Sequence, residues 1–299
     1  MAMTKNKTGS AAAVPAKAKK KSMTVQVIKR LRKNRTAMAG AIIMVVLILI
    51  AVLAPVIAPY SPTEMDLTSM YAHPSARHLF GCDSIGRDIL SRLIYGARYS
   101  LTLGFASAII GAILGVIIGA LAGYIGGLTD NITMRIMDVW SSIPGMLLAI
   151  IISTTLGPGF VNTIIAMTIG HIPGGARATR AMSLKEREME YLEAAQSINC
   201  TRLSIVFKHM LPNIISPTIV ATTMGIGSAI TGAAGLAFIG LGIQPPDPEW
   251  GAMLSAGRNY ISNHPHLLIF PGLCIAVTVL AINLLGDGLR DALDPKLKR

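Results

Sequence analysis

Charged and aromatic residues are scarce in this chain of 299 residues. Asp, Glu, Lys and Arg together make up 14% of it and Phe, Trp and Tyr only 5%, whereas 52% is hydrophobic. Soluble globular domains usually carry about 25% charged residues. The composition therefore argues against an ordinary soluble protein and favours an all-α membrane protein.

Acidic residues are fewer than basic ones, which leaves a net charge of +12. The lysines and arginines lie beside apolar runs and are not interleaved with aromatics on one polar domain, as nucleic-acid binding would require. We therefore expect no nucleic acid as a partner. The basic residues are expected to set the orientation in the membrane and to contact lipid.

Cysteine is also rare. Cys82, Cys200 and Cys274 are far apart in the sequence and have no metal-ligand spacing. This pattern predicts neither a disulfide framework nor a metal site.

Ionisable side chains are almost missing from the apolar runs, where His171 is the one such group well inside a run. Ion-driven carriers generally need carboxylates or a comparable relay within the membrane, and an intramembrane enzyme needs paired catalytic groups. The sequence therefore predicts no catalytic residue. His171 is interpreted as a structural or pore-lining side chain, with a proton relay as the alternative.

Six apolar runs are long enough to cross a bilayer, which takes about 20 residues. They cover residues 37–58, 99–123, 139–157, 160–177, 214–239 and 267–286. Prolines and glycines interrupt the third and fourth, at Pro144, 157–159 and 173–175. Such breaks are tolerated next to other helices or a water-filled path, so these two helices are expected to line something other than lipid.

The distribution of lysine and arginine fixes the expected orientation. Residues 1–36 hold eleven of them and no acidic residue, which predicts a disordered cytoplasmic tail. With that tail inside, 22 of the 27 basic residues fall on the cytoplasmic side and both termini are cytoplasmic. The expected division is the tail 1–36, the first helix with an external loop 37–97, the transmembrane core 98–288 and a C-terminal tail 289–299.

The second run contains Gly111, Gly115, Gly119 and Gly123, each four residues from the next. On a helix they share one face, along which another backbone can approach closely. The pattern predicts a helix-packing surface. It does not say whether the neighbour belongs to this chain or to a partner.

Two external loops are expected. Residues 84–97 carry apolar side chains at helical spacing, with Arg87, Asp88 and Arg92 on another face, which predicts an amphipathic helix on the membrane surface. The second loop, 240–266, is a stiff, proline-rich connection in which Trp250 is interpreted as an interfacial aromatic. Both loops are candidate docking surfaces for an extracytoplasmic partner, through Asp83, Arg87, Asp88 and Trp250.

The largest internal loop, 177–213, is predicted to be helical and cytoplasmic. Ser183 and Glu186 fit a capping box that would start a helix, and a second short helix is expected over about 201–210. Pro212 would then begin the fifth span. The apolar side chains of this loop need a surface to bury against, which predicts docking of a partner. These side chains are Tyr191, Leu192, Ala195, Ile198 and Leu203.

This loop, with Glu193-Ala194-Ala195, Asn199 and Leu211-Pro212, resembles the Glu-Ala-Ala loop of type-1 ABC importer permeases. Three more stretches, 78–88, 237–254 and 283–295, resemble the dipeptide, oligopeptide and nickel branch of that family. The resemblance runs from about residue 24 to the C-terminus. Four motifs in the family's order make chance agreement very improbable.

The resemblance implies a permease subunit of the bacterial cell membrane that imports di- or oligopeptides. Its implied partners are a second, similar permease, two cytoplasmic ABC ATPases and an extracytoplasmic peptide-binding protein. The 183–212 loop would couple the permease to the ATPases through the residues Tyr191, Leu192, Glu193, Ala194, Ala195, Asn199, Leu211 and Pro212. The chain has no Gly-x-x-x-x-Gly-Lys-Ser/Thr loop, so we expect ATP to bind the partner subunits and no cofactor to bind here.

One residue departs from the family pattern, because Asn199 stands where these permeases usually have glycine. If the position takes a left-handed turn, asparagine tolerates it better than other non-glycine residues do. We therefore predict a positive φ at Asn199.

Two alternatives remain open from the sequence. Peptide and nickel importers share these motifs, so another small solute is possible within the family. Outside it, a gated channel would explain six spans and glycine-rich packing, although not the large helical cytoplasmic loop, and no selectivity filter is visible.

Overall fold

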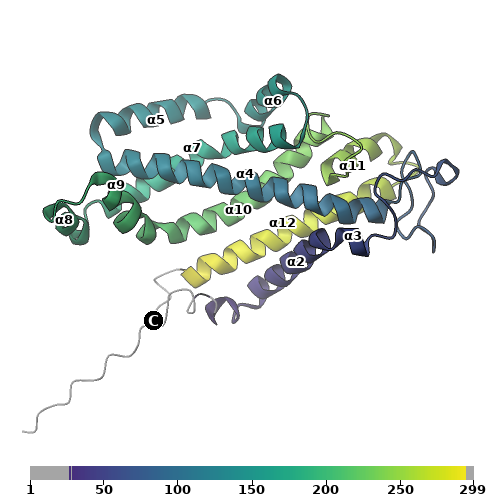
Figure 1. Cartoon of the computed structure of the whole chain (residues 1–299), viewed down its shortest axis with the longest axis horizontal. Coiled ribbons are helices and arrows are strands. Elements are labelled where there is room, and N and C mark those ends of the chain that lie inside the picture. Colours follow the sequence, from purple (N-terminus) through teal and green to yellow (C-terminus); the bar gives the residue numbers. More distant parts are fainter. Residues whose placement is uncertain (1–26, 28, 294–299) are drawn as a thin grey trace, which may run out of the picture.

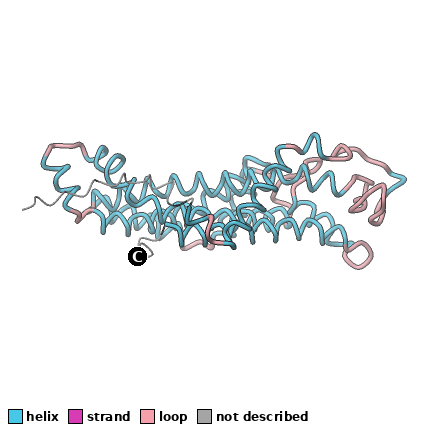
Figure 2. Tube along the Cα trace, turned by 90° about the horizontal axis from the view of Figure 1, so that it is seen from below, coloured by secondary structure: helices cyan, strands magenta, loops and turns pink. Residues whose placement is uncertain are grey.

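The computed structural model describes residue 27 and residues 29–293. The predicted tail 1–36 thus lies largely outside the described residues, as do the last six residues of the C-terminal tail. The described part is helical and contains no β-strand beyond one isolated bridge. Most loops gather at the two ends of an elongated bundle (Figure 2), which supports the predicted all-α membrane fold.

The bundle is built from long helices that run side by side (Figure 1). The helices of the described part are α2 (Arg35–Val52), α3 (Ala54–Ile57), η1 (Leu67–Ser69), α4 (Ile89–Ile125), α5 (Gly127–Ser141), α6 (Gly145–Leu156), α7 (Phe160–Glu186), α8 (Glu190–Ser197), α9 (Arg202–Ser204), η2 (Ile205–Met210), α10 (Leu211–Phe238), α11 (Trp250–Gly257), η3 (Arg258–Tyr260) and α12 (His266–Leu293). The helices α4 and α7 pack along one another, and α12 packs against α2 and α10.

By length and hydropathy, four stretches of the described residues are able to cross a membrane: Arg35–Val52, Ile89–Ile125, Arg202–Phe238 and His266–Leu293. The bent pair α5 and α6 makes a fifth if it counts as one span. The helix α7, predicted as the fourth span, carries Arg177, Arg180 and Lys185 in its second half. The six-span arrangement with both termini in the cytoplasm stays a prediction.

The prediction of a separate amphipathic helix over residues 84–97 is wrong. Asp88 caps the start of one continuous helix of 37 residues, α4, which includes both this segment and the second predicted span. No proline interrupts residues 89–125, and Gly96 packs against Trp250. Nothing therefore ends the helix between the 84–97 segment and the second predicted span. The apolar pattern on 85–97 reflects burial inside the protein and not contact with the membrane surface.

The third predicted span, 139–157, is bent by 81° between α5 and α6. Pro144 has an extended backbone (φ −53°, ψ 132°) and stands before the first residue of α6. A residue that precedes proline is also disfavoured in the helical region, so the chain turns here. A two-point ion pair between Arg180 of α7 and Asp130 of α5, at 2.7 and 2.5 Å, ties α5 to the bundle.

The predicted capping box is also wrong, because α7 continues through Pro173, Gly174 and Gly175 to Glu186. Ser183 therefore lies inside α7, where its hydroxyl donates to the carbonyl oxygen of Thr179 at 2.9 Å. Ser183 is fully buried against Gly123 of α4. The serine that suggested a helix start contributes instead to the contact between two long helices.

Candidate functional site

The helix α8 and the turn that follows it project from one end of the bundle (Figure 1). Leu192 is 0% exposed and Ala195 5%, so these two residues, which were predicted to bury against a partner, are instead buried within this chain. They belong to a cluster with Ala120 and Tyr124 of α4 and with Ile205, Val206, Met210 and Ile214. This cluster fixes α8 and the segment 202–210 as one hairpin (residues 190–210), here called the coupling hairpin after the role predicted for it from the sequence.

The turn of the coupling hairpin depends on Asn199, whose φ is +60°. The backbone N–H of Cys200 donates to the carbonyl of Ala195 at 3.1 Å, and that of Asn199 donates to Gln196 at 2.9 Å. These two bonds form a Schellman motif, which ends a helix with one left-handed residue. The predicted positive φ at Asn199 is present, and its physical reason is this helix end.

Several apolar side chains of the coupling hairpin remain exposed. Ile198 is 76% exposed, Leu203 60% and Phe207 44%. Glu193 and Ala194 are exposed on the side of α8 that faces away from the cluster. An exposed group of large apolar residues on a rigid, polar-rimmed hairpin is typical of a protein interaction surface.

Tyr191 joins the coupling hairpin to its two neighbouring helices. Its hydroxyl donates to Oε1 of Glu186 at 2.7 Å and accepts from the amide of Asn213 at 3.0 Å. Partial burial, followed by the bond to Glu186, raises the pKa of Tyr191 to about 12. The phenol thus stays protonated and keeps donating at physiological pH.

Leu211 and Pro212 begin α10 directly after the hairpin. Leu211 is half-buried against the same cluster as Leu192, and Pro212 is exposed in the first helical turn. The helical backbone continues from Arg202 to Phe238 through this point, and the N–H of Leu211 donates to the carbonyl of Val206 in the π-helical turn that precedes Pro212. The two residues therefore connect the coupling hairpin rigidly to a long helix of the bundle.

The four glycines of α4 face α7 of the same chain. A Cβ atom on Gly111 would lie 2.8 Å from Cβ of His171, and one on Gly123 would lie 2.8 Å from Cβ of Ser183. Between them, a Cβ on Gly115 would lie 3.0 Å from the backbone of α7, and one on Gly119 would meet the carbonyl oxygen of Ala176. Only glycine permits such a close approach of the two backbones. The contact extends along α7 from His171 to Ser183, near the coupling hairpin.

His171 lines a cavity of about 510 Å³ between α4, α7 and α10. The cavity walls are mostly small or apolar, with Thr179, Thr218 and Thr222 as polar members. Its size falls within the ordinary range of small-molecule sites. The structure thus places the one histidine of the apolar runs beside this partly open cavity, next to the glycine contact.

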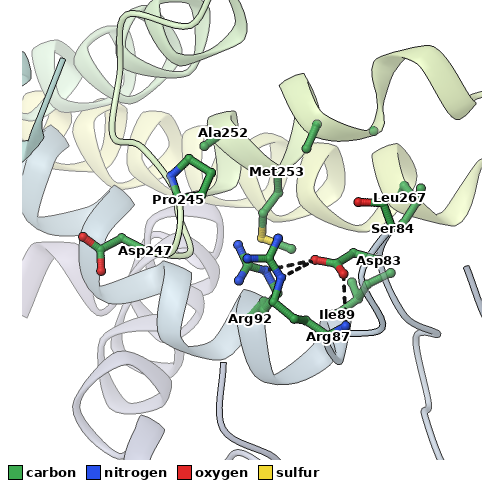
Figure 3. Close-up of a pocket in the computed structure, with 12 residues that line it drawn as sticks. Asp83, Ser84, Arg87, Ile89, Arg92, Pro245, Asp247, Ala252, Met253 and Leu267 are labelled. Atoms are coloured by element: carbon green, nitrogen blue, oxygen red, sulfur yellow. Dashed lines mark hydrogen bonds and ion pairs between the residues drawn. The ribbon is translucent and has the colours of Figure 1, made fainter. Parts of the chain in front are cut away.

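The predicted docking residues lie at the opposite end of the bundle, where Arg87, Asp88 and Trp250 are buried and Asp83 is partly exposed. Asp83 accepts from Nε of Arg87 at 2.7 Å and lies 3.7 Å from Nε of Arg92 (Figure 3). Asp88 accepts from the N–H of Ser91 at 2.8 Å and lies 3.0 Å from Nδ1 of His78. These groups hold the loop before α4 together from within, and the buried side chains of Arg87 and Asp88 offer little surface to a partner.

Trp250 is not the interfacial aromatic that was expected, because it is only 1% exposed. Its indole N–H donates to the carbonyl of Leu93 at 3.0 Å. The neighbouring Glu249 caps α11 by accepting from two backbone N–H groups and also accepts from Ser100 at 2.9 Å. Burial raises the pKa of Glu249, while its hydrogen bonds oppose that rise.

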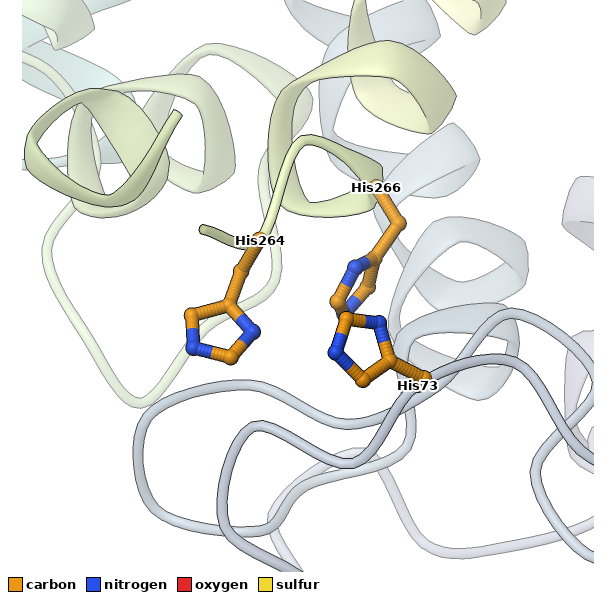
Figure 4. A group of neighbouring side chains, drawn as sticks. All are labelled: His73, His264 and His266. Carbon is orange, nitrogen blue, oxygen red and sulfur yellow. The ribbon is translucent and has the colours of Figure 1, made fainter. Parts of the chain in front are cut away.

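No metal site was predicted from the sequence, but the fold brings three histidines together. His73, His264 and His266 come from the external loop and from the start of α12 (Figure 4). The His-x-His spacing at 264–266 was the available signal. His73 is almost 200 positions away and had no visible link to it.

The comparisons with known proteins agree with this architecture. Residues 115–299 match the family described as "Binding-protein-dependent transport system inner membrane component". Residues 22–74 match the "N-terminal TM domain of oligopeptide transport permease C". Together, the two matches cover most of the chain.

Relatives with high identity extend over nearly the whole chain. The glutathione transport system permease protein GsiD of Escherichia coli O1:K1 / APEC is 46% identical over 271 residues, which cover 90% of this chain and 89% of the relative. GsiD of Shigella flexneri serotype 5b (strain 8401) is 48% identical over the same share of each chain.

Solved structures support the fold. An inward-facing structure of the MetNI methionine ABC transporter is 21% identical, with a TM-score of 0.56, and covers 68% of this chain and 96% of its own. A second crystal form gives 22% identity and the same TM-score, over 69% and 98% of the two chains. With these findings the family resemblance is confirmed: the chain belongs to the inner-membrane permeases of bacterial ABC importers, a family of transport proteins and not of enzymes.

Proposed function

We propose that this chain is one of two permease subunits in an importer of short peptides, with glutathione-like tripeptides included. The observation that carries the substrate class is the 46% identity, over 90% of the chain, to a permease named for glutathione transport. The proposal includes a second, similar permease, two ABC ATPases and an extracytoplasmic binding protein. ATP binds those ATPases, and this chain needs no cofactor.

Coupling to the ATPase is assigned to the coupling hairpin. Its buried residues hold it rigidly on α4 and α10, and its exposed residues, led by Ile198 and Leu203, offer an apolar surface. The first residues of α10 directly follow the hairpin, so a force on the hairpin reaches a helix that lines the cavity. Closure of an ATPase dimer would then reorient α10 and α7 around the transport path.

The substrate path is assigned to the cavity beside His171. Two permeases would place two such cavities around a common axis. The small side chains of α4, α7 and α10 that line each cavity would then face the substrate. Nickel or another small solute is the alternative substrate, because nickel importers share the motifs. A gated channel would not need the coupling hairpin.

The test is ATP-dependent uptake by the complete complex in proteoliposomes, with glutathione, a dipeptide and Ni²⁺ offered in turn. We expect uptake of glutathione or the dipeptide, and uptake of Ni²⁺ alone would overturn the peptide assignment. Uptake without ATP or ATPase subunits would instead support the channel.

Coupling is tested separately by replacing Ile198 and Leu203 with serine. Both side chains are exposed, so the variant should fold while losing ATPase co-purification and uptake. Leu67→Ser is the matched control, because Leu67 is 67% exposed at the opposite end of the bundle. Wild-type ATPase binding by the Ile198/Leu203 variant would refute the role of the hairpin.

A further inference from the structure

Half of the chain's six histidines gather at one place, at the end of the bundle opposite the coupling hairpin. His73 lies in the loop after η1, and His264 and His266 flank Pro265 at the start of α12. One ligand nitrogen of each histidine lies within 4.8 Å of those of the other two (Figure 4). The ring centroids are 5.3 to 5.9 Å apart.

Two ring nitrogens in this cluster have no hydrogen-bond partner in the described part of the structure. They are Nδ1 of His264 and Nε2 of His266, and both atoms are buried. A buried polar atom without a partner is unfavourable by about 1–3 kcal/mol, so such atoms are rare in folded proteins. Aromatic packing of the rings accounts for their positions but leaves these nitrogens unexplained.

The surroundings hold the rings in place. The His264 ring stacks on Tyr71 at 4.7 Å with an interplanar angle of 21°, and Tyr71 in turn lies 4.9 Å from Tyr260. Gly81 leaves space beside His266, because a Cβ atom there would lie only 3.1 Å from Nε2. Two of the three candidate ligands thus have close neighbours, and the third, His73, is exposed beside their rings.

We propose that His73, His264 and His266 bind one divalent transition-metal ion of the zinc type. Imidazole nitrogen suits Zn²⁺ well, and three histidines leave a fourth position for water or another ligand. Zinc–nitrogen bonds of about 2.0–2.1 Å require the donors to come closer than the present separations of up to 4.8 Å, so all three rings must shift slightly on binding, and the exposed His73 has the most room to do so. The bound ion would tie the external loop to the connection between α11 and α12.

This proposal differs from the importer function, because the ion would be a structural ion and not a transported solute. It would bind in the cap, the end of the bundle opposite the coupling hairpin that is formed by residues 59–100 and 239–266. The cavity beside His171 is a separate space with different lining residues. A failure of metal binding would leave the transport proposal intact, and a failure of peptide uptake would leave the metal site intact.

The test uses the full-length chain, purified in detergent through an affinity tag that contains no histidine. Calorimetric titration with Zn²⁺ after chelator treatment should show one ion per chain, and Co²⁺ should give the visible absorption of a tetrahedral site. His73→Ala, His264→Ala and His266→Ala should each weaken Zn²⁺ binding by at least about tenfold. His209→Ala, in the coupling hairpin, is the matched control and should bind like the wild type.

A second measurement guards against misfolded variants. Zn²⁺ should raise the melting temperature of the wild type and slow hydrogen exchange in residues 70–85, and His73→Ala should lose both effects. Because His73 is exposed, that variant should melt like the metal-free wild type. No stoichiometric Zn²⁺ binding, or binding that survives His73→Ala and His264→Ala, would overturn the proposal.

Discussion

The two ends of the bundle are stabilised in different ways. At the cap, polar bonds join residues far apart in the chain: Tyr99 to Asp247, Ser100 to Glu249 and Leu93 to Trp250, over 148 to 157 positions. At the coupling hairpin, an apolar cluster of residues 192–214 rests on α4, and large apolar side chains remain exposed. These polar groups of the cap are paired within the chain, apart from a buried ring nitrogen in each of three histidines that has no partner among the described residues. The coupling hairpin is held by apolar contacts and leaves an apolar surface exposed.

This difference suggests a division of roles. An end whose charged and aromatic side chains are buried in mutual contacts is expected to be rigid and to affect folding when altered. An end with a rigid base and an exposed apolar surface is expected to affect partner binding when altered. Four substitutions test this division, in order of decreasing expected effect.

Trp250→Ala should have the largest effect on stability. It removes a fully buried indole and its bond to Leu93, which predicts a loss of about 3–5 kcal/mol. Thermal unfolding in detergent measures it. Trp140→Ala is the control, because Trp140 is half-buried on α5 and should lose clearly less. Equal losses would contradict the account of the cap.

Gly115→Val should destabilise the α4–α7 contact by about 1–3 kcal/mol or more, because the new side chain meets the backbone of α7. Thermal unfolding again provides the measurement. In Gly174→Ala, on α7, the added Cβ would have no atom within 4 Å, so this variant should melt like the wild type. If Gly115→Val is as stable as the control, the glycines do not set the helix contact.

Asn199→Val should weaken coupling while the protein still reaches the membrane. A β-branched residue at a φ of +60° is strained by about 1–2 kcal/mol, which would distort the turn of the coupling hairpin. Asn199→Gly should behave like the wild type, because glycine accepts this φ. ATP-dependent uptake and membrane abundance are measured together. Unchanged uptake by the valine variant would count against the hairpin's role.

Tyr191→Phe should have the smallest effect. It removes the bonds to Glu186 and Asn213 but keeps the ring, and partly exposed hydrogen bonds contribute about 0.5–1.5 kcal/mol. We expect uptake within about threefold of the wild type. A complete loss would show that the phenol contacts the ATPase directly.

The family resemblance made the turn of the coupling hairpin predictable. Glycine usually stands at the position of Asn199 in that family, which indicated a left-handed turn, and the Schellman bonds of Cys200 and Asn199 explain it. The glycine spacing on α4 likewise indicated close packing, since helix periodicity alone places the four residues on one face. The partner helix, α7, depended on the tertiary fold and could not be read from spacing.

The contacts of the cap also depend on the tertiary fold and could not be predicted from local sequence patterns. Arg87, Asp88 and Trp250 look like surface residues in the sequence, because the groups that satisfy them lie elsewhere in the chain. The sequence also did not reveal that α7 continues past Pro173. A single proline in a long helix is tolerated when neighbouring helices pack around it, and those neighbours are known only from the fold. The histidine cluster depends on a contact between residues nearly 200 positions apart.

The most direct test of the account is a photo-crosslink from the coupling hairpin. A photo-reactive amino acid at position 203 should attach to the ATPase subunit of the assembled importer, and the same group at position 67 should not. An ATPase adduct from position 203 alone, changing in yield when ATP is added, is the predicted result. No adduct from position 203, or an equal yield from both positions, would contradict the assignment of this hairpin to the ATPase.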